Sequence, residues 1–179
     1  ERWLVDGLPE EATLCAGISD AEGLGMAWSR ASLGPTTVLD VVDDGGWSIR
    51  ILHPVAHAID ADALHWGAVE TGGALVGRIS FENRTITIAG LVEAPSDSVR
   101  EAARFVLGTS GLVQSLRAAN AASLGYLAFI GTWHSHPKGG AHSGIDRNTL
   151  RSIAEDAGGL PAVSLVWTPT GLTCAVDRW

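Results

Sequence analysis

The chain has 179 residues, 46% of them hydrophobic, so it is long enough for one domain with a real core and is not disordered throughout. Its formal net charge of -8, from 12 Lys and Arg against 20 Asp and Glu residues, argues against nucleic-acid binding, because that affinity depends on clustered cations. No apolar run approaches the roughly 20 residues of a membrane-spanning helix. We therefore expect neither a nucleic acid nor a membrane as partner.

The first 45 residues differ in composition from the rest. They are rich in acidic residues, glycine and small residues, and they close on a strong turn signal at 43–46 (DDGG). We therefore expect an N-terminal extension at 1–45 and a domain at 46–179. There is no initiator Met and no signal peptide, and Cys15 and Cys174 form neither a disulfide framework nor a four-thiolate site. The sequence predicts a fragment of a longer cytoplasmic polypeptide with reduced thiols.

Strand and helix patterns are clear after that turn. Alternating residues predict a strand at 47–52, and Pro54 suits the first turn of a helix. The apolar residues at helical spacing are Val55, Ile59, Ala63, Trp66 and Val69. That helix is expected to end near residues 70–73, where two glycines stand. Apolar segments at 74–77 and 84–92, joined by a polar turn, predict a hairpin.

The second half of the predicted domain continues this alternation. Its predicted elements are a short strand near 105–107, a helix at 110–122, a buried strand at 126–133, a helix at 145–157, and a closing hairpin of strands at 162–167 and 172–176. The order predicts an α/β fold, in which a mixed, twisted β-sheet is flanked by three helices.

Two histidines separated by one residue follow the buried strand predicted at 126–133. Side chains alternate across a strand, so His134 and His136 are expected on one face and Ser135 on the other. A pair of this kind can be structural, exposed or metal-binding. Two imidazoles on one face can share an ion.

Residues 143–146 (SGID) admit two interpretations. Ser143 and Asp146 can form an ordinary capping box at the start of a helix. Alternatively, the glycine-containing segment 138–141 can fold back and bring an Asp146 oxygen to the two histidines. Three nitrogen or oxygen ligands with an open position are typical of a catalytic zinc, which makes water nucleophilic at neutral pH.

Such a zinc site also needs a base. Glu70 is the candidate, because it stands at a Gly-Gly corner between a predicted helix and a core strand. The alternative is an ordinary solvated carboxylate at the end of a helix. Sequence spacing leaves both interpretations open.

Three segments, in order, resemble a known family. They are residues 70–77 (ETGGALVG), 131–137 (GTWHSHP) and 143–146 (SGID). Together they resemble the JAMM metalloproteases, the catalytically equipped MPN or JAB domains that include deubiquitinating enzymes and prokaryotic relatives. The resemblance covers about residues 47–179. It implies the MPN/JAB fold, which is cytidine-deaminase-like.

The resemblance also implies roles for five residues. His134, His136 and Asp146 would be the ligands of one Zn²⁺. Glu70 would hold and deprotonate a water molecule, and Ser143 would hydrogen-bond the oxyanion. The implied reaction is hydrolysis of an amide bond without a covalent intermediate.

The sequence departs from the family pattern in one loop. Asp146 lies ten positions after His136 where eleven are usual, and His142 stands where prokaryotic members commonly have proline. We expect His142 to be solvated; the alternatives are a substrate contact or an extra ligand. His53 and His57 lack the glutamate of a zincin motif and are expected on a helix surface.

The resemblance predicts a zinc metallopeptidase that cuts a peptide or isopeptide bond after the C-terminal tail of a ubiquitin-like protein. It also suggests a fused or associated adenylating domain of the activating-enzyme type, to which residues 1–45 would connect. Two alternatives stay open. One is a non-catalytic MPN scaffold, and the other is a zinc hydrolase of a small-molecule or cell-wall peptide amide.

Overall fold

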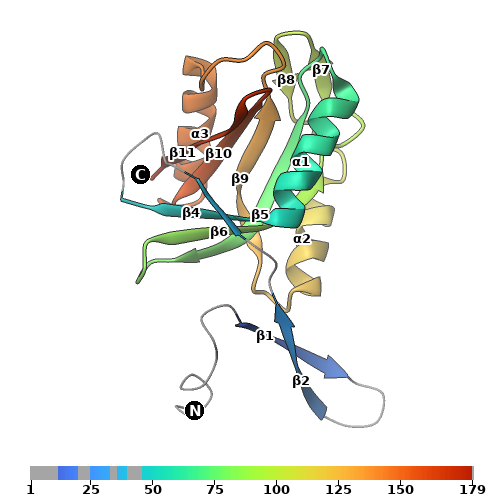
Figure 1. The fold of residues 1–179 in the computed structure, drawn as a ribbon, viewed down its shortest axis with the longest axis vertical. Coiled ribbons are helices and arrows are strands. Elements are labelled where there is room, and N and C mark those ends of the chain that lie inside the picture. The colour runs from blue at the N-terminus through green and yellow to red at the C-terminus, as the bar shows by residue number, and fades with distance from the viewer. Residues whose placement is uncertain (1–11, 20–24, 33–35, 40–45, 179) are drawn as a thin grey trace. The chain divides into compact units, whose positions relative to one another are not determined.

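A computed structural model describes residues 12–19, 25–32, 36–39 and 46–178. The chain divides into two compact units, Glu1–Thr36 and Thr37–Trp179. In the first unit, β1 (Ala12–Ser19) and β2 (Gly25–Ser32) pair as an antiparallel hairpin (Figure 1). Residues 40–45, which hold most of the predicted domain boundary, lie outside the described residues.

The second unit is built on a seven-stranded sheet in the order β11-β10-β9-β5-β6-β4-β3. The strands are β3 (Thr36–Leu39), β4 (Ser48–Leu52), β5 (Gly72–Ser80), β6 (Thr85–Glu93), β9 (Ala128–Ser135), β10 (Ala162–Thr168) and β11 (Gly171–Asp177). β9 pairs with β10 in parallel and with β5 antiparallel, and β4 pairs with β6 in parallel. The predicted mixed α/β sheet is confirmed.

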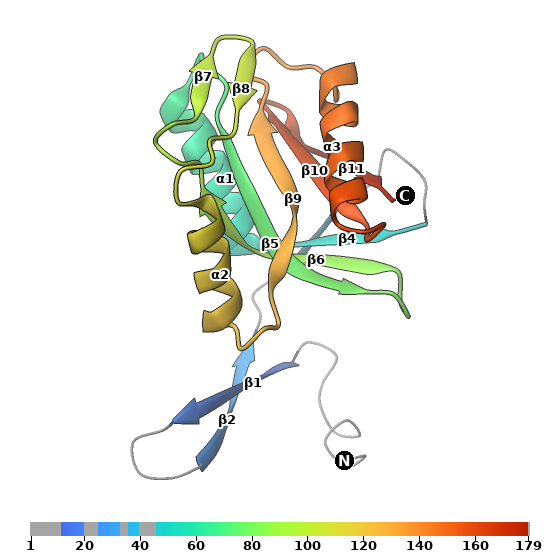
Figure 2. The same cartoon turned by 180° about the vertical axis from the view of Figure 1, so that it is seen from behind.

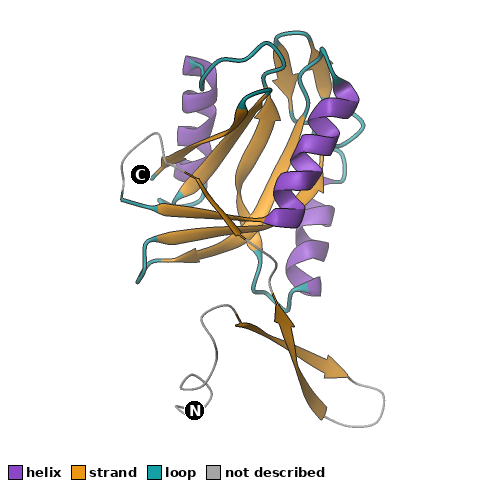
Figure 3. Ribbon diagram, in the orientation of Figure 1, coloured by secondary structure: helices purple, strands orange, loops and turns teal. Residues whose placement is uncertain are grey.

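Three helices flank the sheet in the described part of the chain, and Figure 3 colours them apart from the strands. They are α1 (His53–Trp66), α2 (Leu112–Ala122) and α3 (Gly144–Asp156). α1 covers one face, and α2 and α3 lie on the other (Figures 1 and 2). None of the described helices is long and apolar enough to cross a membrane.

The main core lies between α1 and the sheet. The buried side of α1 carries Val55, Ile59 and Ala63, one per turn, which pack on the apolar faces of β4 and β6. On the other face, Leu150 and Ala154 of α3 pack against the last two strands. Burial in the main core raises the pKa of the Cys174 thiol to about 12, which disfavours the reactive thiolate form.

α1 ends earlier than its apolar spacing predicts. Gly67, at φ 61°, donates its backbone N–H to the carbonyl of Ala63, and this closes the helix after Trp66. Val69 keeps helical spacing in the sequence but lies in the turn that follows. Glu70 therefore follows a turn and lies two residues before the start of β5.

One further expectation needed correction. β9 starts at Ala128 and is buried only from Ile130 onward; Phe129 is 40% exposed. α2 has no fully buried residue, but Leu112, Leu116 and Ala119, at helical spacing, are half-buried. A second small hairpin, β7 (Val99–Glu101) with β8 (Arg104–Val106), was predicted only in its second strand.

Candidate metal centre

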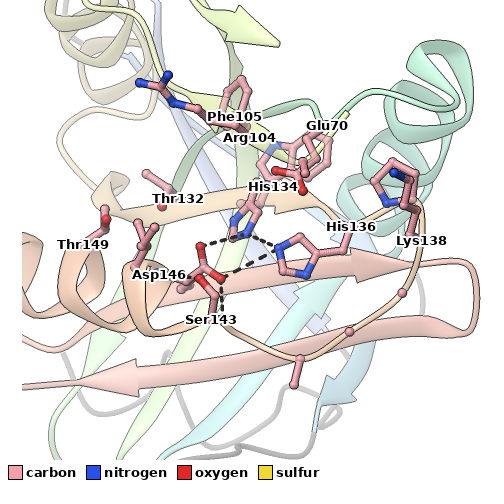
Figure 4. A pocket seen from close by; sticks show the side chains of 18 of the residues that line it. Glu70, Arg104, Phe105, Thr132, His134, His136, Lys138, Ser143, Asp146 and Thr149 are labelled. Atoms are coloured by element: carbon pink, nitrogen blue, oxygen red, sulfur yellow. Dashed lines mark hydrogen bonds and ion pairs between the residues drawn. The ribbon is translucent and has the colours of Figure 1, made fainter. Parts of the chain in front are cut away.

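The two histidines of the HSHP segment meet at the end of β9. Side-chain alternation puts His134 and His136 on one face, and their Nε2 atoms lie 3.0 Å apart (Figure 4). The backbone N–H of His136 donates to the carbonyl of Trp167 at 2.7 Å, which holds the second histidine against β10 beyond the end of β9. Ser135 points the other way and is fully buried.

The carboxylate of Asp146 reaches both histidines from the first turn of α3. Its Oδ1 lies 3.3 Å from His134 Nε2, and its Oδ2 lies 3.8 Å from His136 Nε2. The same aspartate completes a capping box, because Oδ2 accepts from the backbone N–H of Ser143 at 2.6 Å while Ser143 Oγ accepts from the Asp146 N–H at 3.2 Å. The two interpretations of residues 143–146 therefore coexist, and the cap orients the carboxylate.

The environment of Asp146 keeps it ionised. Burial raises its pKa, but the hydrogen bonds from His134 and Ser143 outweigh burial and hold the pKa well below the ordinary value of an aspartate. The partly buried site thus presents one negative charge beside two imidazole nitrogens.

The spacing of these donor atoms suits a single zinc ion. Around a tetrahedral Zn²⁺ with bonds of about 2.0–2.1 Å, neighbouring ligand atoms lie about 3.3 Å apart. The distance between the two histidine Nε2 atoms, 3.0 Å, and that from His134 Nε2 to Asp146 Oδ1, 3.3 Å, lie near that value, and one ligand atom from each of the three residues lies within 4.8 Å of the others. Two imidazoles and one carboxylate are also a donor set that zinc accepts while keeping one position open. His134, His136 and Asp146 are thus the residues that could hold a metal.

Glu70 lines the same cavity, which has a volume of about 470 Å³. Its backbone N–H donates to the carbonyl of Glu101 at 2.8 Å, so the β7–β8 hairpin holds it in place. Burial raises the pKa of the Glu70 carboxyl, although His136 and His134 act to lower it. Glu70 is therefore a half-buried residue of the cavity that the two histidines also line, rather than a fully exposed group at a helix end.

All five residues to which the family resemblance assigned a role line this one cavity. Ser143 sits at its edge, where its hydroxyl accepts the cap hydrogen bond and can still donate its own proton. The cavity is walled by the β7–β8 hairpin on one side and by the loop after His136 on the other.

A hydrogen-bond network that the sequence did not predict ties Glu70's neighbour to the histidine segment. The buried Thr71 donates its N–H to Ser135 Oγ at 3.0 Å and accepts from the Ser135 N–H at 2.7 Å. Its hydroxyl donates to Asp62 at 2.9 Å and accepts from Arg100 at 3.2 Å. The only signal in the sequence was Ser135 itself, because a hydroxyl that points into a core needs a partner.

His142 is buried rather than solvated. Its side chain is 8% exposed, and its Nε2 lies 3.1 Å from the carbonyl oxygen of Ser164 in β10. Burial lowers its pKa, so the ring is neutral near pH 7. The expectation failed because the loop folds back onto the sheet. His53 and His57 are exposed on α1, as predicted.

Replacing Ser143 separates its capping role from any chemical role. We expect Ser143→Ala to lower the free energy of unfolding by about 1 kcal/mol, because α3 loses its N-cap acceptor. Ser143→Asn keeps an acceptor and should restore most of that stability without restoring a hydroxyl. Urea unfolding measures both variants, with the exposed mid-helix Ser152→Ala as control. Equal stability of Ser143→Ala and wild type would contradict the cap.

Comparisons with known proteins place the chain in a family. Residues 52–178 match the family described as prokaryotic homologs of the JAB domain. A protein of Enterobacter hormaechei subsp. hoffmannii (strain UCI 50), named CD-NTase/cGAS isopeptidase, is 31% identical over 134 residues, which cover 74% of this chain and 73% of that protein. A Desulfitobacterium hafniense protein solved in solution is 17% identical, with a TM-score of 0.48 over 73% of this chain and 89% of its own. The chain belongs to the prokaryotic JAB-domain family.

Proposed function

We propose that this chain is a zinc-dependent isopeptidase of the JAMM type, with its catalytic domain at residues 46–179. The observation that carries the proposal is the convergence of His134, His136, Asp146 and Glu70 in one cavity. The isopeptidase name of the Enterobacter relative supports the same class of bond.

Three side chains would hold the metal. His134 and His136 present imidazole nitrogens, and the ionised Asp146 adds the negative charge that a divalent cation favours. A bound Zn²⁺ would supply Lewis acidity, which makes water nucleophilic near neutral pH and polarises the scissile carbonyl.

Two further side chains would act on protons. Glu70, with its raised pKa, accepts a proton from the attacking water and passes it to the leaving amine. The Ser143 hydroxyl donates a hydrogen bond to the oxygen of the scissile carbonyl as negative charge builds on it. Neither step forms a bond between the protein and the substrate.

The proposed substrate is a protein joined through the C-terminal tail of a ubiquitin-like protein to an amine. An extended tail suits a cavity bounded by a hairpin and a loop. Such a conjugate forms only after the tail carboxylate is activated, so an adenylating enzyme must supply the substrate. We propose that enzyme as the functional partner.

Metal content and cleavage test the proposal together. The purified protein should hold one zinc per chain and cut a ubiquitin-like fusion after its tail, as read by mass spectrometry. His134→Ala should lose the zinc, whereas the exposed His57→Ala should keep it. A chelator should stop cleavage, and added zinc should restore it.

Two outcomes would count against the proposal. A wild-type protein without stoichiometric zinc would favour the non-catalytic scaffold. A zinc-loaded protein that cuts none of several ubiquitin-like fusions, yet hydrolyses small peptide amides, would move the substrate to that smaller class.

A further inference from the structure

The loop that connects the second histidine to α3 contains two glycines with positive φ values, Gly139 at 79° and Gly140 at 117°. Residues 138–141 are all exposed. The Gly139 N–H donates to the His136 carbonyl at 2.9 Å, which orders the start of the loop. The end of the loop carries Ser143, whose backbone N–H bonds to the Asp146 carboxylate and whose hydroxyl accepts from the Asp146 N–H. This end therefore needs a contact of its own.

His142 is the single buried residue between positions 138 and 145. Its neighbours Ala141 and Ser143 are exposed, whereas its own side chain is 8% exposed. The Ser164 carbonyl is only an acceptor, so His142 Nε2 must carry the proton of their 3.1 Å hydrogen bond. One directional contact thus fixes the end of the loop directly before the helix cap.

β10 is a rigid strand to which both ends of the loop can be attached. All seven residues of β10 are buried, and β10 receives both ends of the loop: the His136 N–H bonds to the carbonyl of Trp167, and His142 bonds to that of Ser164. The two anchor points lie three residues apart on one strand. His136 and Asp146, the candidate ligands on either side of the loop, are therefore both positioned relative to β10.

We propose that His142 is a positioning residue, whose hydrogen bond to Ser164 holds Ser143 in its capping place and thereby aims Asp146 at His134 and His136. We do not assign His142 as an additional ligand, because the ligand group in the described residues comprises the other three side chains; its Nε2 bonds to Ser164, and its buried Nδ1 has no hydrogen-bond partner. This inference rests on the proposed metal centre.

The test compares His142→Gln with His142→Leu. Glutamine can place an amide N–H near the position of the imidazole Nε2, whereas leucine fills the space without a donor. The exposed His53→Leu is the matched control for loss of an imidazole. Hydrogen exchange of the Ser143 and Asp146 amides is measured by NMR on metal-free protein, and the zinc Kd is measured by competition with a chromophoric chelator.

In His142→Leu we expect the two cap amides to exchange at least 10-fold faster and the zinc Kd to rise about 10- to 100-fold, the range for residues that orient metal ligands. His142→Gln should keep both the exchange rates of the cap amides and the zinc Kd within about 3-fold of wild type. A lower unfolding midpoint in His142→Leu with unchanged cap exchange and zinc Kd would overturn the proposal, as would equal behaviour of the two variants. If wild type binds no zinc, the proposed function fails, while cap exchange still decides whether His142 anchors the loop.

Discussion

Glu70→Gln is expected to lower kcat for hydrolysis of a ubiquitin-like fusion by about 1,000-fold and to leave one zinc per chain. A glutamine amide has nearly the shape of the carboxylate but cannot accept a proton from water, and general acid–base catalysis of this kind typically contributes about 10²- to 10⁴-fold. The zinc content should hold because Glu70 lies outside the three-residue ligand group. Single-turnover cleavage and metal analysis of the same sample measure the two quantities.

Glu101→Gln is the control for this change. Glu101 is exposed on β7, and its contact with the Glu70 backbone uses only its own carbonyl, so its side chain can be neutralised without touching the cavity. It should retain wild-type turnover. If Glu70→Gln instead kept more than about a tenth of the activity, the base would have to be another group, because a general base of the expected strength is worth more than that.

Gly131→Ala is expected to destabilise the protein by more than about 4 kcal/mol, because it forces two core strands apart. A Cβ at this position would clash with the carbonyl oxygen of Val163, its register partner in β10. The backbone there, at φ 146°, is also one that residues with a side chain rarely adopt. Urea unfolding, or failure to obtain folded protein, measures the loss.

Gly144→Ala is the control for Gly131→Ala, because a methyl group fits at residue 144. No atom lies within 4 Å of a Cβ at Gly144, and its φ is not in the left-handed region. We expect the free energy of unfolding to change by less than about 1 kcal/mol, because the new methyl group meets no atom and only restricts the unfolded chain. A similarly small change in Gly131→Ala would mean that β9 and β10 can separate at little cost.

The parts of the fold that follow from local spacing were predicted from the sequence. The β5–β6 hairpin follows from the alternation that buries Ile86 and Ile88, and α3 follows from Leu150 and Ala154 one turn apart. The end of α1 was missed because Val69 continues the helical spacing past the glycine that closes the helix. The exposure of Phe129 was missed because apolar composition predicts burial only where another surface covers the side chain.

In the candidate site, too, the residues set by local spacing were predicted from it, and those that depend on distant segments were not. The pairing of His134 with His136 follows from strand alternation, and Asp146 follows from a capping pattern within the same short segment. Glu70 was a candidate base from its place at a Gly-Gly corner, but no local spacing connects it to the histidines, so only the resemblance to a family gave it a role beside them. His142 was misjudged because its burial depends on β10, which comes later in the chain.

The hydrogen bonds between Thr71 and Ser135 join positions that are 64 residues apart. They can form only when β5 and β9 have paired, because Gly72 and His134 are opposite each other in that register. A chain in which these two strands have not paired, or have separated locally, therefore holds Glu70 and the two histidines on unconnected segments. The candidate centre can assemble only when the middle of the sheet has formed.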